Sequence, residues 1–186
     1  MKSRYLIIAG IISSVVIFDQ VTKFLVKKFM SLYAHIEIIG DFFQFTYIEN
    51  PGMAFGIQME NKILFTILSI GAAIIVAVYL YRMRNDKTPI IIALCLILGG
   101  AIGNLIDRLI YGKVIDFLDI EFFDISLPSL NLVLFEFPGY DLTRWPIFNI
   151  ADSSVTIGMV IITWMILFVK ENKVNVPVTK VESTSS

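Results

Sequence analysis

The sequence predicts a membrane protein, mainly α-helical, with four transmembrane helices and a small extracytoplasmic β-sheet. Of its 186 residues, 56% are hydrophobic, and the mean hydropathy is +0.78, whereas soluble domains are nearer 45–50% apolar. The apolar residues fall in four long blocks, not in the one-sided stripe of a soluble helix. Between the first two blocks, the stretch IEIIGDFFQFTYIEN alternates loosely and is rich in aromatic and β-branched residues, which indicates a short hairpin or small sheet outside the bilayer.

The four blocks predict helices over about residues 5–26, 63–81, 89–110 and 152–169, each close to the length needed to cross a bilayer. The N-terminus resembles a signal peptide, but no small-x-small cleavage site follows. Apolar residues also resume after Asp19 and Gln20. We therefore expect a retained first helix within one membrane domain, residues 1–172, followed by a disordered polar tail, residues 173–186.

The distribution of basic residues favours cytoplasmic N- and C-termini. The basic residues in favour precede the first apolar block, lie in the connector at 82–87 or follow the last block; they are Lys2, Arg4, Arg82, Arg84, Lys87, Lys170 and Lys173. Residues 27–62 and 111–151 then lie on the extracytoplasmic side, although Lys27, Lys28, Lys62 and Arg144 count against this orientation. This orientation places every unusual polar group near one membrane face.

The stretch from Gly99 to Phe117 carries Asn104, Asp107, Arg108 and Asp116 at the point where the third apolar block ends. Polar and ionisable groups at such a position are costly, which makes a functional role the default interpretation. Asp19 and Lys23 share one face of the first helix, and Asp152 begins the fourth. We expect all of them to converge at the outer face.

Asp116 and Asp152 are the candidate catalytic pair. Asp116 follows the third helix after Gly112 allows a turn, and Asn149 and Asp152 lie at the entry to the fourth helix. If these helices are neighbours, the two carboxylates meet and cannot both ionise, so the pair shares a proton. Such a pair can activate water and polarise a carbonyl, which is the chemistry of amide hydrolysis.

Each polar residue also has a structural interpretation. Asp152 is a favoured helix N-cap, and Asp107 with Arg108 would form an interfacial charge pair with Arg108 snorkelling. Asn104 and Arg108, four residues apart, would tie helices together, and Asp19 with Lys23 would fix helix register.

Other classes of protein remain as alternatives to an enzyme. A small membrane transporter would also place Asp and Arg within the membrane, but four spans are few and no inverted repeat is visible. A non-catalytic membrane scaffold would tolerate replacement of both aspartates by Asn. The net charge of −1 gives no indication of nucleic-acid binding. One cysteine, Cys95, and one histidine, His35, provide neither a disulfide nor a metal-ligand cluster.

Four motifs together resemble the boxes of lipoprotein signal peptidase, or signal peptidase II. They are DQVTK (19–23), NPGMAFG (50–56), GNLIDRLIYGKVIDF (103–117) and FNIADSS (148–154). The resemblance implies an aspartyl intramembrane protease of the bacterial inner membrane, with a small extracytoplasmic β-sheet platform. It further implies cleavage of prolipoproteins before the diacylglyceryl-modified lipobox cysteine, membrane lipid as a partner and no metal or other cofactor. We expect a monomer.

By motif position, the resemblance makes Asp116 and Asp152 the catalytic dyad. The other matching positions, expected around the substrate, are Asp19, Lys23, Asn50, Gly52, Asn104, Arg108 and Asn149. Of these, Asn104, Arg108 and Asn149 would position the substrate backbone and order the dyad.

The sequence departs from the family pattern in two places. Met53 stands where the family usually has a small residue, and 35 residues, Phe117 to Ala151, separate the two aspartates. This long connection is aromatic and acidic, and we expect an added outer loop or interfacial element over the active site.

Overall fold

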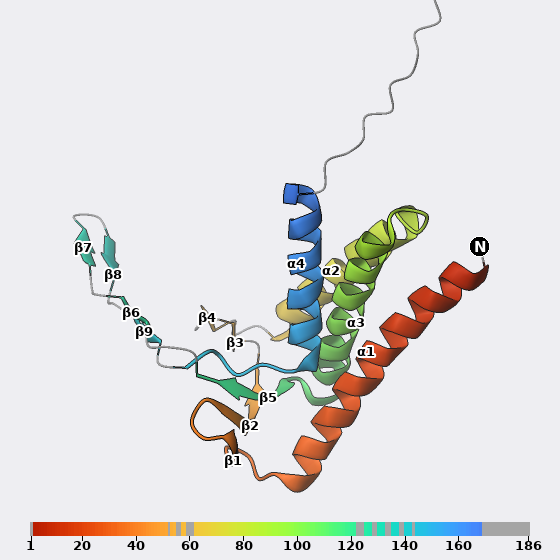
Figure 1. The fold of residues 1–186 in the computed structure, drawn as a ribbon. Coiled ribbons are helices and arrows are strands. Elements are labelled where there is room, and N and C mark those ends of the chain that lie inside the picture. Colours follow the sequence, from red (N-terminus) through yellow and green to blue (C-terminus); the bar gives the residue numbers. More distant parts are fainter. Residues whose placement is uncertain are drawn as a thin grey trace, which may run out of the picture.

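The computed structural model describes residues 2–51, 53–54, 57–58, 62–121, 125–127, 130–132, 135–137, 140–142 and 144–168. Within them are four helices long and apolar enough to cross a membrane. These helices (Figure 1) are α1 (Lys2–Phe29), α2 (Lys62–Arg82), α3 (Thr88–Tyr111) and α4 (Ile150–Phe168). The predicted fold class is confirmed, and each helix begins and ends within a few residues of the range expected from hydropathy.

Helix α3 is the centre of the bundle and packs against the other three helices. Two glycines allow this close packing. A Cβ atom on Gly100 would collide with the carbonyl oxygen of Ala151 in α4, and one on Gly103 would lie 2.6 Å from Oδ2 of Asp19 in α1. Helices α1 and α4 therefore approach α3 closely at the level where the polar residues lie.

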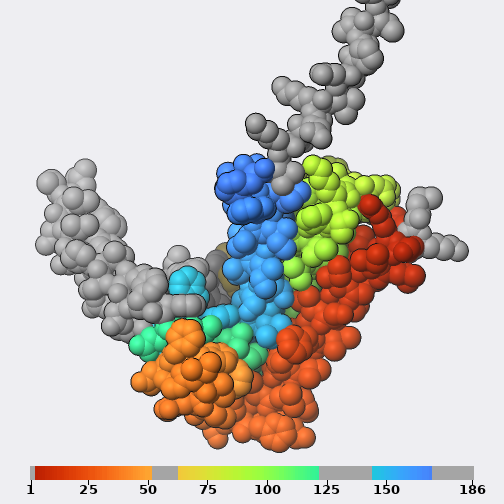
Figure 2. Space-filling model, viewed as in Figure 1, coloured from red at the N-terminus to blue at the C-terminus, as the bar shows by residue number. Residues whose placement is uncertain are grey.

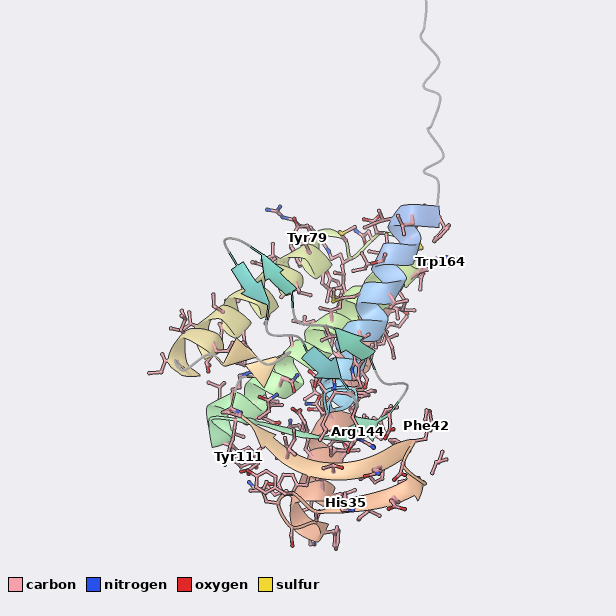
Figure 3. The ribbon with its side chains drawn as sticks, turned by 90° about the vertical axis from the view of Figure 1, so that its left-hand side faces the viewer. His35, Phe42, Tyr79, Tyr111, Arg144 and Trp164 are labelled. Atoms are coloured by element: carbon pink, nitrogen blue, oxygen red, sulfur yellow. The ribbon has the colours of Figure 1, made fainter. Side chains whose placement is uncertain are left out.

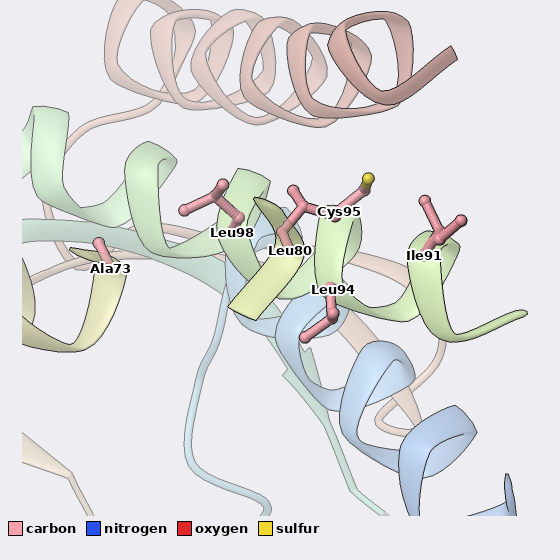
Figure 4. Close-up of a cluster of buried hydrophobic side chains, with 6 residues drawn as sticks. All are labelled: Ala73, Leu80, Ile91, Leu94, Cys95 and Leu98. Carbon is pink, nitrogen blue, oxygen red and sulfur yellow. The ribbon is translucent and has the colours of Figure 1, made fainter. Parts of the chain in front are cut away.

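Nearer the N-terminus of α3, on the side of this level away from the sheet, the bundle is held by apolar packing between α2 and α3. The buried cluster (Figure 4) consists of Ala73, Leu80, Ile91, Leu94, Cys95 and Leu98. Away from this cluster, the helices expose large apolar side chains, including Tyr79 at 55% and Trp164 at 60% (Figure 3). In a membrane protein these outward faces contact lipid, so their exposure carries no penalty.

Helix α3 ends in a turn that leads directly into a strand. Pro89 lies in its first turn, as the sequence predicts, and Gly112 terminates it in the left-handed conformation, with φ of 68° and its N–H bonded to the Arg108 carbonyl. Strand β5 (Val114–Ile120) follows at once. Asp116 is thereby held on a strand adjoining the end of α3.

Strand β5 completes a three-stranded antiparallel sheet of order β1-β2-β5 at one end of the bundle (Figures 1 and 2). Strands β1 (His35–Ile39) and β2 (Phe43–Asn50) form the hairpin that the alternating stretch predicts, and Gly40 adopts a positive φ of 47° between them. A second buried cluster joins the sheet to α1 and consists of Val26, Tyr47, Ile115 and Phe117.

Six shorter strands complete the described chain. Strand β3 (Met53–Ala54) pairs with β4 (Ile57–Gln58), both between β2 and α2. Between β5 and α4, β6 (Ile125–Leu127) pairs with β9 (Tyr140–Leu142), and β7 (Leu130–Leu132) pairs with β8 (Phe135–Phe137). The predicted tail, residues 173–186, lies outside the described residues.

Candidate active site

Asp116 is buried on β5, with 2% of its surface exposed, and receives hydrogen bonds from two asparagines. The Asn149 side chain donates from Nδ2 to Oδ1 of Asp116 at 2.7 Å, and Asn50 donates from Nδ2 to Oδ2 at 3.0 Å. Asn50 lies on β2 and Asn149 immediately precedes α4. The carboxyl group is thus oriented from two separate parts of the chain.

Asp152 lies in the first turn of α4, and each of its two carboxylate oxygens accepts a hydrogen bond. Asn104 of α3 donates from Nδ2 to its Oδ1 at 2.7 Å, and the backbone N–H of Asn149 donates to its Oδ2 at 3.2 Å. The backbone N–H of Asp152 in turn donates to Oδ1 of Asn149 at 2.9 Å. This reciprocal pattern is a capping box, in which Asn149 is the N-cap and Asp152 the third helical residue. Asp152 therefore does contribute to helix capping, while its other oxygen remains bound to α3.

Burial and the neighbouring charge of Asp152 raise the pKa of Asp116 to about 7, although hydrogen bonds from Asn50 and Asn149 oppose the shift. Burial is the larger cause, because it penalises the ionised carboxylate. A carboxyl group with this pKa is partly protonated at neutral pH. Asp116 and Asp152 are thus close enough for the charge of one to oppose ionisation of the other.

A fully buried ion cluster lies behind the two aspartates. The Lys23 ammonium is 2.9 Å from Oδ2 of Asp19, from Oδ2 of Asp107 and from Oδ1 of Asn104. The side chains of Lys23 and both carboxylates are at most 2% exposed. Three ligands around one ammonium satisfy all its donors, the condition under which buried charge is tolerated.

Each carboxylate of this cluster also holds the backbone next to a dyad residue. Asp19 Oδ1 accepts the N–H of Ala151 at 2.9 Å, and Asp107 Oδ2 accepts the N–H of Ile115 at 3.1 Å. Ala151 and Ile115 are the residues immediately before Asp152 and Asp116. The alternative of an Asp107–Arg108 charge pair is not what the structure has, because Asp107 faces α1 and binds Lys23 instead.

Arg108 lies beside the dyad with an unused donor. Its guanidinium is 4.5 Å from the centre of the Phe65 ring, and the charges of Asp152 and Asp116 act on it. Within the described residues its buried Nε has no hydrogen-bond partner. A buried donor without a partner is costly, and a bound ligand is one way to satisfy it.

Comparison with known proteins decides the family. The sequence profile of Signal peptidase (SPase) II matches residues 11–168. The chain belongs to the signal peptidase II family. A lipoprotein signal peptidase of Chlorobium phaeobacteroides is 36% identical over 146 residues, which are 78% of this chain and 81% of that protein. The corresponding protein of Moorella thermoacetica is 33% identical and covers 80% and 85%.

A solved structure of a bacterial membrane enzyme has a TM-score of 0.67 and 34% sequence identity to this signal peptidase II, covering 88% of this chain and 94% of the other. A second such structure has a TM-score of 0.66 at 33% identity, covering 90% and 93%. The four-helix fold is therefore shared over nearly the whole enzyme, and the chain is a membrane peptidase.

The fold of this signal peptidase II brings together the polar residues singled out in the sequence, apart from Gly52, which lies outside the described residues. Around Asp116 and Asp152 lie Asn50, Asn104, Arg108 and Asn149, with Asp19 and Lys23 in the buried cluster behind them. Sequence reasoning gave no role to Gln20, whose Nε2 binds both Asp19 and Asp107. Gln20 could have been identified from its position next to Asp19, where the first apolar block is interrupted. The described residues contain no group of three or more His, Cys, Asp or Glu suited to a metal ion.

Proposed function

We propose that this signal peptidase II is an aspartyl endopeptidase that removes the signal peptide from prolipoproteins, cleaving before the diacylglyceryl-modified lipobox cysteine. The observation that carries the proposal is the geometry of Asp116 and Asp152, each oriented by asparagines, with the pKa of Asp116 at about 7. Relatives named lipoprotein signal peptidase support the substrate class.

In the proposed reaction, the ionised member of the dyad takes a proton from water as the water oxygen attacks the scissile carbonyl carbon. The protonated member donates its proton to the carbonyl oxygen, which gives a neutral tetrahedral intermediate. Collapse of this intermediate breaks the C–N bond: one of its hydroxyl groups returns a proton to the ionised carboxylate, and the proton taken from water passes to the leaving nitrogen. The two carboxyl groups end the cycle sharing one proton again.

In this scheme the surrounding side chains position the two aspartates and the substrate. Asn149 and Asn50 orient the Asp116 carboxyl, and Asn104 orients Asp152. The Nε–H of Arg108 has no hydrogen-bond partner among the described residues, and the charges of both aspartates act on its guanidinium, so we assign this donor to a carbonyl of the substrate backbone. Fixing the reacting groups in this way lowers the entropic part of the barrier.

The dyad and the β1-β2-β5 sheet lie at the same end of the helices (Figure 1), and we propose that this end is extracytoplasmic, with both termini cytoplasmic. The basic connector at 82–87 supports this orientation. The signal peptide would enter laterally from the lipid while the diacylglyceryl chains remain in the bilayer. We further propose that the enzyme acts as a monomer and requires no cofactor.

The test is cleavage of a diacylglyceryl-modified prolipoprotein by purified wild type, Asp116→Asn and Asp152→Asn in detergent. We expect each variant to lose activity by orders of magnitude while remaining folded. Asp41→Asn, a change at an exposed aspartate of the β1–β2 turn, is the matched control and should retain wild-type turnover. Near-normal cleavage by either dyad variant would remove that aspartate from the mechanism and favour a scaffold.

A further inference from the structure

The stretch of chain that leads into α4, residues 145–148, runs antiparallel to β5, and we call it the return segment. The N–H of Trp145 donates to the Ile120 carbonyl at 3.0 Å. Leu118 and Phe148 form an antiparallel bridge and exchange two hydrogen bonds, at 2.7 Å from the Leu118 N–H and at 3.0 Å from the Phe148 N–H. The return segment is thereby aligned with β5 by backbone contacts at two points.

The alignment of the return segment determines which side chain reaches Asp116. Asn149 directly follows Phe148, and its Nδ2 donates to Oδ1 of Asp116 at 2.7 Å and to the carbonyl of Ile115 at 3.3 Å. A shift of one residue between antiparallel partners turns every side chain to the opposite face. Such a slip would bring a different residue to Asp116 and would also move Asp152, at the start of α4, relative to β5.

Backbone hydrogen bonds alone do not specify this alignment. Every residue except proline offers the same N–H and C=O groups, so a slipped register would form similar bonds. Residues 122–143 separate Glu121 from Arg144, and the cost of closing so long a connection varies only slowly with its length. The length of the chain therefore leaves the point of re-entry open, and a specific side-chain contact is the means of fixing it.

Arg144 makes such a contact immediately before the return segment (Figure 3). Its guanidinium donates from Nε to Oδ1 of Asp119 at 2.8 Å, from Nη1 to Oε2 of Glu121 at 2.5 Å and from Nη2 to the backbone carbonyl of Asp41 at 3.0 Å. Three donors of one rigid, planar group fix its orientation as well as its position. Asp119 is itself held, because it is 5% exposed and its Oδ2 accepts the Thr46 hydroxyl of β2 at 2.6 Å. Arg144 therefore clamps the start of the return segment to two strands of the sheet.

We infer that Arg144 is a positioning residue, which fixes the register of the return segment on β5 and thereby places Asn149 at Asp116. Its hydrogen bonds go to the sheet, so it acts on the dyad through the return segment. Because its side chain is 29% exposed, its ion pairs add little to overall stability, and the main effect is on geometry. The inference rests on the proposed function for its cleavage readout, whereas the register is measured separately.

The register is tested by disulfide formation in the full chain in detergent. Residues that exchange both backbone hydrogen bonds lie about 5.5 Å apart at Cα, within reach of a disulfide, so Leu118→Cys/Phe148→Cys should cross-link. Leu118→Cys/Ile147→Cys, in which the second cysteine faces the other way, should not. With Arg144→Gln added, we expect cross-linking at 118–148 to decrease and the 118–147 product to appear. Cys95 is 0% exposed and does not compete.

The consequence for the site is tested by cleavage of a diacylglyceryl-modified prolipoprotein. A misplaced dyad impairs turnover more than substrate binding, so we expect kcat of Arg144→Gln to fall roughly 10- to 100-fold with little change in KM. Oxidation of Leu118→Cys/Phe148→Cys in the Arg144→Gln background should restore turnover relative to the reduced form, because the disulfide replaces the clamp. Arg82→Gln, at an exposed arginine that ends α2, is the matched control and should change neither kcat nor the cross-linking pattern.

The outcomes separate this inference from the proposed function. An unchanged cross-linking pattern in Arg144→Gln would overturn the inference, because the register would then not depend on the clamp. A changed pattern with unchanged kcat, or a loss of kcat that the disulfide does not restore, would also overturn it. If the wild type fails to cleave the prolipoprotein while the pattern still changes in Arg144→Gln, the proposed function fails and the role of Arg144 in fixing the register stands.

Discussion

Asn149 joins Asp116 to Asp152. Its side-chain Nδ2 donates to Oδ1 of Asp116 at 2.7 Å, while its Oδ1 accepts the backbone N–H of Asp152 at 2.9 Å. The side-chain amide of Asn149 therefore fixes the position of the Asp116 carboxyl on β5 relative to the first turn of α4. A single residue performs both helix capping and ordering of the proposed dyad.

These two roles of Asn149 are separable by substitution. Asn149→Ser keeps a side-chain oxygen suited to an N-cap but loses the Nδ2 donor to Asp116, whereas Asn149→Ala loses both. We expect kcat to fall about 100-fold in both variants, because the dyad is misplaced. Only Asn149→Ala should lose a further ~1 kcal/mol of stability. Parallel measurement of prolipoprotein cleavage and apparent Tm checks this, and full activity in Asn149→Ser would show that Asp116 needs no such donor.

Asp116 makes the stability of the protein depend on pH. Its pKa is about 7 in the folded protein against an ordinary value of 3.8. Below the lower value the carboxyl is protonated in both states and carries no penalty. As the pH rises toward 7, only the unfolded chain releases the proton, so stability is lost progressively, by roughly 4 kcal/mol in total.

Asp116→Asn removes this titration. We expect the variant to have a higher apparent Tm than wild type at about pH 8, with the difference shrinking as the pH approaches about 4. Thermal unfolding of both proteins across this range provides the measurement. A Tm difference that is constant with pH would mean that Asp116 titrates near its ordinary value.

Hydropathy was sufficient to predict the helices, because a bilayer-spanning block is a long and unambiguous signal. The expected helix orientation also predicted that Asp19, Asn104 and Asp152 lie at one membrane face. The sequence could not assign ion-pair partners, because Asp107 and Arg108 are adjacent in sequence but point in different directions around α3. Only the packing of α1 against Gly103 determines that Lys23, and not Arg108, neutralises Asp107.

The role of β5 was also outside the reach of sequence patterns. The run Val114–Ile120 has no clear alternation because both of its faces are largely buried, one on α1 and one on the site. Its pairing partner β2 is more than 60 residues away, as in the Asn50–Asp116 contact. Long-range register of this kind depends on tertiary packing.

The buried lysine should be far more important to stability than an exposed one. Lys23→Met leaves Asp19 and Asp107 buried without their cation, and we expect a loss of about 3–5 kcal/mol. Lys113→Met removes a half-exposed pair with Glu49 and should cost no more than ~1 kcal/mol. Apparent Tm values of the two variants test the contrast. Similar losses in both would contradict the assignment of Lys23 as the cation that holds the site backbone.

Gly103 gives a second test of the same region through packing. A methyl group there would lie 2.6 Å from Oδ2 of Asp19 and 3.3 Å from the Ala151 side chain, so Gly103→Ala forces α1 and α4 away from α3. Overpacking of this kind costs about 1–3 kcal/mol, and the displaced Asp19 would release the Ala151 N–H beside Asp152.

Gly71→Ala is the matched control, because a Cβ at Gly71 in α2 meets nothing within 4 Å. We expect this control to be neutral or stabilising by up to ~1 kcal/mol through helix propensity. The measurements are apparent Tm and prolipoprotein cleavage for both variants. A decrease of both in Gly103→Ala, but not in Gly71→Ala, would link the close packing of α3 to the geometry of the site. An unaffected Gly103→Ala would show that α1 is free to shift.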